Sequence, residues 1–168
     1  MKTLILGGAR SGKSCYAEKM AEQATRQVIY IATATAGDGE MQQRIEQHQA
    51  QRPSDWQLIE EPLKLSEALR RIDNKNNIVL VDCLTLWLSN ILAENDRCVE
   101  PLVNDLVDTV AEMSAEVLLV SNEVGQGIVP LGELSRKFVD ESGRMHQKLA
   151  QVCEHVVFIT AGLPQILK

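Results

Sequence analysis

Residues 7–14 read GGARSGKS, a spacing of glycine, lysine and serine that is suited to holding phosphate groups. Gly7, four further residues, Gly12, Lys13 and Ser14 match the P-loop pattern, in which backbone N–H groups surround phosphate oxygens. The lysine ammonium reaches the β- and γ-phosphates, and the serine hydroxyl can join the coordination shell of Mg²⁺. The dipole of a following helix adds partial positive charge. The spacing therefore predicts binding of a nucleoside triphosphate.

The residues on either side of the glycine-rich loop supply the context that the motif requires. The apolar run TLIL (3–6) precedes the loop, and Ala17, Met20, Ala21 and Ala24 follow it at helical spacing. Strand, loop and helix thus come in the required order. The alternative is a tight strand-to-helix turn that carries Gly-Lys-Ser without binding phosphate.

An acidic residue, Asp82, closes the apolar run IVLV. At the carboxyl end of a buried strand, a Walker B carboxylate would polarise Mg²⁺ or its bound water. The alternative is that Asp82 caps the helix that begins near Leu84. Both roles are compatible, and the P-loop favours the metal role.

A histidine lies in the polar stretch that follows the second apolar run. Met41, Ile45 and His48 fall at positions i, i+4 and i+7, so spacing alone favours a histidine packed on an apolar helix face. However, the preceding strand should open on the nucleotide site at its carboxyl end. A neutral imidazole can attack phosphorus, so His48 is also chemically suited to covalent transfer. His146 and His155 are weaker candidates, which we interpret as structural or solvated.

Composition limits the class of protein and its partners. The 168 residues, 45% of them hydrophobic and 24% charged, predict one folded domain spanning residues 1–168. A net charge of −6 argues against nucleic acid as a partner, because binding to a phosphate backbone depends on a basic surface.

The cysteines and the apolar runs indicate the compartment. The four cysteines show neither a CxxC pair nor zinc-ligand spacing, so we interpret them as reduced thiols. The first strand begins at once, which leaves no room for a signal peptide, and no apolar run reaches membrane-spanning length. We therefore expect a cytoplasmic protein without a membrane span.

Alternating apolar runs and helical patterns predict the fold. The predicted strands are 3–6, 28–33, 56–61, 77–82, 116–121 and 156–160. Helical patterns lie between most of them, at 65–72, 84–92, 102–113 and 134–152. The tail AGLPQILK predicts a turn into a short antiparallel edge strand. The fold class is therefore α/β, a P-loop NTPase-like three-layer domain with a mostly parallel sheet and one antiparallel edge strand.

The stretch SNEVGQGIVPLGE (121–133) leaves the fifth predicted strand on the side where ligands gather in such sheets. Gly125 and Gly127 would permit close approach of the backbone to a ligand. An ordinary turn is the alternative, because a GxG pair in a loop is a weak signal.

Several of these motifs occur together and in order in one family. The segments GGARSGKS, YIATATAGDGEMQQRIEQHQAQRP, W followed by IEEP, VDCLTLWLSN and SNEVGQGIVP closely resemble the bifunctional adenosylcobinamide kinase and adenosylcobinamide-phosphate guanylyltransferase family of cobalamin biosynthesis. The resemblance extends from residue 4 almost to the C-terminus. The P-loop is shared by many families, but its combination with RIEQH, RP and NEVGQGIVP is specific.

The resemblance implies two reactions. The first is phosphorylation of adenosylcobinamide by ATP or GTP, and the second is transfer of GMP from GTP to the new phosphate through a GMP-histidine intermediate. The histidine of the family pattern falls on His48, and Lys13 is the second catalytic residue. Mg²⁺ would be held by Ser14 and Asp82. The resemblance also implies a corrinoid substrate and a homo-oligomer, in this family a trimer.

The same matching gives the residues that contact the nucleotide. They are expected in the P-loop, after the second strand, after His48 and at two further strand ends: Gly7, Gly8, Ala9, Arg10, Ser11, Gly12, Lys13, Ser14, Ala32, Thr33, Ala34, Gln49, Ala50, Gln51, Arg52, Glu60 and Asp82.

Two other functions fit the P-loop without the resemblance. The first is a monofunctional small-molecule kinase in which His48 only packs. The second is a RecA-like nucleotide-gated module, which would associate with a macromolecule and have no need of a corrinoid.

Overall fold

The computed structural model describes residues 1–34 and 55–168. The strands of this part of the chain are β1 (Lys2–Gly7), β2 (Gln27–Ala32), β3 (Gln57–Glu60), β4 (Asn77–Asp82), β5 (Glu116–Asn122), β6 (His155–Thr160) and β7 (Leu163–Ile166). The helices are α1 (Lys13–Glu22), α3 (Leu65–Ile72), α4 (Leu84–Glu94), the 3-10 turn η1 (Asp96–Cys98), α5 (Val99–Glu112) and α6 (Glu133–Val152).

The described strands form one sheet in the order β3-β2-β4-β5-β1-β6-β7. All neighbouring strands are parallel except β6 and β7, which are antiparallel. The predicted fold class, a mostly parallel sheet with one antiparallel edge strand, is therefore confirmed. The order also places β1, the P-loop strand, between β5 and β6.

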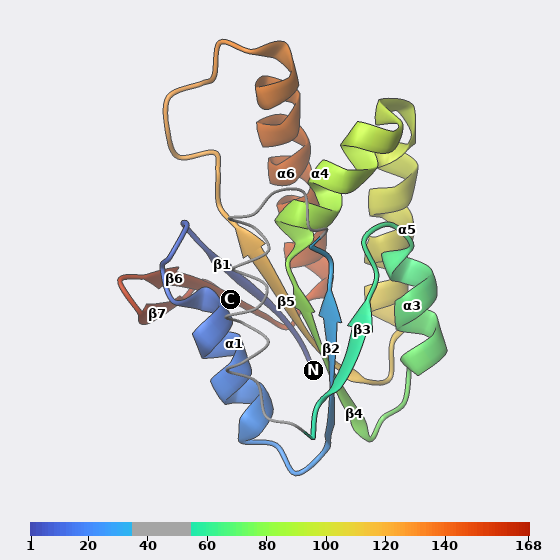
Figure 1. Cartoon of the computed structure of the whole chain (residues 1–168). Helices are drawn as coiled ribbons and strands as arrows, with labels where there is room; N and C mark the ends of the chain where they lie inside the picture. Colours follow the sequence, from blue (N-terminus) through green and yellow to red (C-terminus); the bar gives the residue numbers. More distant parts are fainter. Residues whose placement is uncertain (35–54) are drawn as a thin grey trace.

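Helices cover both faces of this sheet (Figure 1). On one face α1 packs over an apolar cluster that contains Ile5, Ala17, Tyr30 and Leu118. On the other face α3, α4, α5 and α6 enclose the larger cluster, which includes the buried Trp87. The strands between the two layers are apolar on both sides because both faces are buried.

The strand NIVLVD (77–82) shows why the prediction of elements succeeded. Its residues Ile78 to Val81 are fully buried, and β-branched side chains favour a strand that packs on both faces. β3 differs from this pattern, because it lies at the edge of the sheet and leaves Leu58 42% exposed.

No helix in the described ranges is both long enough and apolar enough to cross a membrane. The cysteines are free thiols, as predicted. Cys83 and Cys153 are buried, and burial raises the pKa of each thiol to about 11. These two thiols are therefore protonated and unreactive at neutral pH.

Candidate active site at the P-loop

The P-loop connects β1 to α1 and has the backbone conformation that its glycines permit. Gly12 has a φ of 97°, and Arg10 adopts a φ of 56° in the same left-handed region. Gly12 is the N-cap of α1 and bears no side chain, so it leaves the first N–H groups of the helix unobstructed. These N–H groups and the helix dipole provide an anion-binding end at Lys13.

Close packing against the β6–β7 hairpin fixes the shape of the loop. A Cβ atom on Gly7 would lie 2.5 Å from Ser11 Oγ and 2.6 Å from the carbonyl oxygen of Ile159. A Cβ atom on Gly12 would lie 3.2 Å from the Cα atom of Gly162. Gly7 therefore requires glycine for lack of space, whereas Gly12 requires it for its φ in a position where space is also tight.

Lys13 is held over the loop that it belongs to. Its side chain is buried, and its Nζ donates to the carbonyl oxygen of Gly8 at 3.4 Å. Burial is the main cause of the raised pKa of Cys83, the Asp82 carboxylate adds to the rise, and the Lys13 ammonium opposes it. Lys13 follows the carboxyl end of β1 and Asp82 ends β4, and both strands are parallel to β5, so the P-loop cation and the predicted metal ligand lie at the same edge of the sheet.

Asp82 ends β4, as the sequence predicts, and the structure distinguishes its two proposed roles. The residue at the N-cap of α4 is Cys83, in an extended conformation. The Asp82 carboxylate instead accepts a hydrogen bond from the hydroxyl of Tyr30, between Oη and Oδ2 at 3.1 Å. The helix-capping alternative is therefore wrong, and the carboxylate lies at the carboxyl edge of the sheet.

The remaining described candidates lie in one row across that edge. Ala32 pairs with Glu60 on one side and with Asp82 on the other. The Thr33 hydroxyl donates to the Cys83 carbonyl at 2.6 Å and accepts from the Cys83 N–H at 2.9 Å, which joins the ends of β2 and β4. Thr33 is fully buried, and its backbone is also hydrogen-bonded, the N–H to the Asp82 carbonyl at 3.3 Å and the carbonyl oxygen to Asn90 Nδ2 at 2.9 Å.

The structure thus brings together the predicted residues of the P-loop, the end of β2, the end of β3 and the end of β4. Five of the predicted site residues lie outside the described residues: His48, Gln49, Ala50, Gln51 and Arg52. Their roles, and the contacts of all of these residues with nucleotide, stay predictions.

The sequence placed the stretch 121–133 on the ligand side of the sheet but did not single out the polar residues at the end of β5. Asn122 pairs with Gly7, and the N–H of Glu123 donates to the Gly7 carbonyl at 3.0 Å. Ser121 and His146 are buried directly behind this contact and hydrogen-bond each other. The available signal was the run Ser-Asn-Glu after an apolar strand, because such runs mark the ligand edge of a parallel sheet.

Unsatisfied polar atoms surround the same strand end. Within the described ranges, buried Ser11 Oγ and Asn122 Oδ1 have no hydrogen-bond partner. Such atoms are rare in folded proteins and are usually satisfied by water or a ligand. Their position around Gly7 agrees with a ligand site at the P-loop.

The loop after β5 contains the two glycines that the sequence analysis considered. The N–H of Gly125 donates to Glu123 Oε1 at 2.5 Å, whereas a Cβ atom on Gly127 would meet nothing within 4 Å. The part of the chain described here therefore shows no close packing that requires glycine at 127. In Figure 1 this loop extends away from the sheet before α6 begins.

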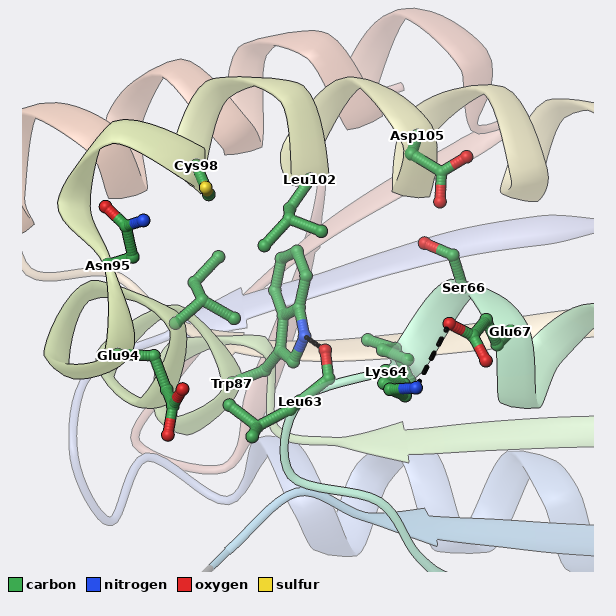
Figure 2. A pocket seen from close by; sticks show the side chains of 12 residues that line it. Leu63, Lys64, Ser66, Glu67, Trp87, Glu94, Asn95, Cys98, Leu102 and Asp105 are labelled. Atoms are coloured by element: carbon green, nitrogen blue, oxygen red, sulfur yellow. Dashed lines mark hydrogen bonds and ion pairs between the residues drawn. The ribbon is translucent and has the colours of Figure 1, made fainter.

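A cavity of about 260 Å³ lies elsewhere, between α3, α4 and α5 (Figure 2). Trp87 lines it, and the indole N–H donates to the carbonyl oxygen of Leu63 at 2.9 Å. Neither the P-loop nor Asp82 contributes to its lining. We therefore place the active site at the P-loop and not in this cavity.

Solved structures with the same architecture include a recombinase and an ATPase. The RadB recombinase is similar to 94% of this chain and 73% of its own, with a TM-score of 0.52 and 16% identity. A prototypical ATPase from a bacterial type III secretion system is similar to 95% of this chain and 52% of its own, with a TM-score of 0.61 and 10% identity. At such low identity these likenesses show the fold alone.

Sequence comparisons give the family. The chain is 52% identical over its full length to the bifunctional adenosylcobalamin biosynthesis protein CobP of Pseudomonas aeruginosa, and covers 98% of that protein. It is 36% identical to the bifunctional adenosylcobalamin biosynthesis protein CobU of Escherichia coli K12, over 97% of each chain. The family model described as cobinamide kinase / cobinamide phosphate guanyltransferase matches residues 3–167. With its P-loop, its strand order and this match along nearly its whole length, the chain belongs to the cobinamide kinase / cobinamide phosphate guanyltransferase family.

Proposed function

We propose that this protein phosphorylates adenosylcobinamide with ATP or GTP, and then transfers GMP from GTP to adenosylcobinamide phosphate to give adenosylcobinamide-GDP. The observation that carries the proposal is the P-loop, with Lys13 and Asp82 at the same edge of the sheet, in a chain of this family. The protein acts as one domain spanning residues 1–168.

In the kinase step the hydroxyl oxygen of the corrinoid side chain attacks the γ-phosphorus. The bond from that phosphorus to the β–γ bridging oxygen breaks, the nucleoside diphosphate leaves, and the hydroxyl proton passes to a base or to solvent. The N–H groups at the start of α1 and the Lys13 ammonium stabilise the charge on the phosphate oxygens. The glycines of the loop let the backbone approach these oxygens.

The residues present fit Mg²⁺. Ser14 follows the P-loop lysine, and Asp82 presents a carboxylate at the carboxyl edge of the sheet, oriented by Tyr30. Among the described residues no group of three or more His, Cys, Asp and Glu side chains could hold a metal ion. This agrees with Mg²⁺, which takes few protein ligands and completes its shell with water and phosphate. When bound, the ion would neutralise charge on the phosphates.

In the second step His48 is the nucleophile. One of its imidazole nitrogens attacks the α-phosphorus of GTP, forming a phosphorus–nitrogen bond while pyrophosphate leaves. The phosphate of adenosylcobinamide phosphate then attacks the same phosphorus and displaces the histidine. Dividing the transfer into two positioned steps avoids a single encounter between two anionic substrates.

The partners follow from these reactions. The protein takes a corrinoid and GTP or ATP, and contacts the nucleotide through its P-loop and through Ala32 to Ala34, Gln49 to Arg52, Glu60 and Asp82. Its net charge of −6 is unfavourable for nucleic acid. We further propose a cytoplasmic homo-oligomer, a trimer as in the family.

The experiment that tests the proposal separates the two reactions through His48. Wild-type protein is incubated with GTP labelled at the α-phosphate, denatured, and assayed for bound label that is lost in acid and retained in base. The variant His48→Asn should still phosphorylate adenosylcobinamide but should form neither the labelled protein nor adenosylcobinamide-GDP.

Label at wild-type level in His48→Asn contradicts the assignment of His48. Phosphorylation of adenosylcobinamide by wild-type protein that never carries label identifies a monofunctional kinase. Protein that transfers nothing to adenosylcobinamide contradicts the proposed function altogether.

A further inference from the structure

A hydrogen-bonded chain of buried polar residues lies behind the P-loop and plays no part in the reactions described above. It joins the start of α4, the end of β5 and the middle of α6. Thr85 Oγ1 and Ser121 Oγ are 3.2 Å apart, and Ser121 Oγ is 2.7 Å from His146 Nε2. All three side chains are buried, with exposed fractions of 7% or less.

One end of this chain is set by the backbone. The Asn122 N–H can only donate, so Thr85 Oγ1 accepts it at 2.6 Å. Either hydroxyl can donate in the Thr85–Ser121 contact, and the Ser121 hydroxyl can donate to His146 Nε2 or accept from it. When Ser121 donates to Nε2, the proton of a neutral His146 is on Nδ1.

The Nδ1 atom faces Glu123, at 3.7 Å from its Oε2. Nδ1 is buried and makes no hydrogen bond to any described residue. Desolvation by burial lowers the pKa of His146, and the Glu123 carboxylate opposes this shift in part. The ring is therefore neutral at pH 7, and in the tautomer with its proton on Nδ1 that proton faces a carboxylate slightly beyond hydrogen-bonding distance.

Glu123 is the residue through which this chain reaches the P-loop. Its N–H donates to the Gly7 carbonyl at 3.0 Å, and its Oε1 accepts from the Gly125 N–H at 2.5 Å. One residue thus holds the first glycine of the P-loop and the first turn of the 123–132 loop. A shift of Glu123 therefore moves both the first glycine of the P-loop and the first turn of the 123–132 loop.

We propose that His146 is a positioning residue, whose Nδ1–H holds the Glu123 carboxylate and so sets the start of the 123–132 loop against Gly7. This inference rests on the proposed function, because the reaction that it supports is phosphoryl transfer at the P-loop. The 3.7 Å separation closes to a hydrogen bond when nucleotide binds, as hydrogen bonds of active sites commonly tighten in the bound complex.

The proposal explains why a histidine occupies this position. The helix α6 buries Ser142, Met145, His146 and Leu149 on one face. An apolar residue at 146 would fill the space without burying an imidazole whose second nitrogen has no partner. A buried imidazole that lowers the stability of the fold in this way indicates that His146 has a role in the site.

The experiment compares His146→Leu and His146→Gln with the exposed control His155→Gln. His146→Leu keeps the volume and loses both polar atoms, whereas the carboxamide of His146→Gln can still donate to Glu123 and accept from Ser121. We expect His146→Leu to lower kcat for adenosylcobinamide phosphorylation roughly 10- to 100-fold, since small displacements of positioned groups have effects of this size. GTP affinity should fall as well, because the contact tightens when nucleotide binds, and His146→Gln should recover part of both losses.

A second measurement tests the hydrogen-bond order without an activity assay. Nitrogen-15 NMR of the wild-type imidazole should show the proton on Nδ1, and its signal should move downfield on addition of GTP as the contact with Glu123 shortens. A proton on Nε2, or a signal unaffected by GTP, overturns the inference, even if His146→Leu fails to fold.

The two proposals fail in different ways. Wild-type kcat in His146→Leu, in protein that phosphorylates adenosylcobinamide, overturns the positioning role and leaves the proposed function in place. Wild-type protein that cannot phosphorylate adenosylcobinamide overturns the proposed function, and the NMR measurement with GTP then decides whether His146 positions Glu123.

Discussion

The N–H of Gly162 donates to the carbonyl oxygen of Ser11 at 2.8 Å, so the turn of the C-terminal β6–β7 hairpin holds the middle of the P-loop. These residues are 151 positions apart in a chain of 168 residues. The hairpin therefore supports the phosphate site in addition to closing the sheet. The support has two points, Gly162 against Gly12 and Ile159 against Gly7.

Replacing Gly7 tests the support at Ile159. In Gly7→Ala the new Cβ atom would lie 2.6 Å from the Ile159 carbonyl oxygen, which is backbone and cannot move aside. We expect a loss of about 2 kcal/mol in the free energy of unfolding, typical of overpacking in a dense region. Gly8→Ala is the matched control, because its Cβ atom would meet nothing within 4 Å. Equal urea midpoints for the two variants would contradict this account.

The P-loop lysine is tested by Lys13→Ala. Removal of the ammonium should lower kcat/KM for adenosylcobinamide phosphorylation by at least about 100-fold, the size of effect seen when one group that stabilises developing charge is removed. Guanylyl transfer should fall with it, because both reactions use the same loop. The exposed Lys19 of α1 provides the control Lys19→Ala. Normal guanylyl transfer with normal GTP affinity in Lys13→Ala would show that the reactions use separate sites.

The aspartate that follows α3 should contribute to stability without affecting activity. Asp73 Oδ1 accepts from the N–H groups of Ser114 and Ala115 at 2.9 and 2.8 Å. Burial tends to raise the pKa of Asp73, but these hydrogen bonds outweigh it and the pKa is lowered. Asp73→Ala should therefore lose about 1 kcal/mol, or a few degrees in Tm, with unchanged kcat. The exposed control Asp108→Ala should match wild type, and a Tm of Asp73→Ala equal to that control would refute the role.

The pH dependence of stability follows from the buried imidazole. Folding lowers the pKa of His146 below its ordinary value of 6.5. As the pH falls below 6.5, His146 is therefore protonated more readily in the unfolded chain than in the folded chain. Stability from this source is present above pH 6.5 and is lost as the pH falls. Glu123 is the charged group that faces the ring, and it reduces the effect. Between about pH 8 and about pH 5, wild-type protein should therefore lose more stability than His146→Gln in urea titrations. Parallel curves for the two proteins would contradict a buried neutral histidine.

The sequence was enough to predict the strands that are buried on both faces. It was not enough to predict contacts that depend on how the helices and strands pack against one another. The predicted strand 77–82 has the observed bounds, because β-branched residues between turn signals identify a central strand. The sequence left His146 as structural or solvated, because it lies beside the predicted apolar face of its helix, a face that included Leu134. In the structure Leu134 is 69% exposed, since the first turn of α6 extends beyond the sheet. The spacing of apolar residues predicts which face of a helix is buried, but tertiary packing determines which turns of that face are covered.

The hydrogen bond between Tyr30 and Asp82 could not be predicted from the sequence for the same reason. Periodicity does not reveal that β2 lies beside β4, so no pattern in the sequence pairs a tyrosine of one strand with an aspartate of the other. The P-loop was predictable because its residues are consecutive. The site around it was less so, because its residues come from the ends of separate strands.

Tyr30 offers a test of the Mg²⁺ site that leaves the proposed ligands in place. Its hydroxyl donates to Asp82 Oδ2 at 3.1 Å, and groups that orient a metal ligand typically change metal affinity when removed. Tyr30→Phe keeps the buried ring and removes only this hydroxyl. We expect the Mg²⁺ concentration needed for half-maximal phosphorylation to rise about 10-fold, with kcat close to wild type at saturating Mg²⁺.

Asp82→Asn, which removes the ligand charge itself, should raise the Mg²⁺ requirement further and lower kcat at saturation. The measurement is a titration of Mg²⁺ at fixed GTP for all three proteins. An unchanged requirement in Asp82→Asn would show that Asp82 does not serve the metal. A change in Tyr30→Phe alone would mean that the tyrosine acts on the site by another route than its bond to Asp82.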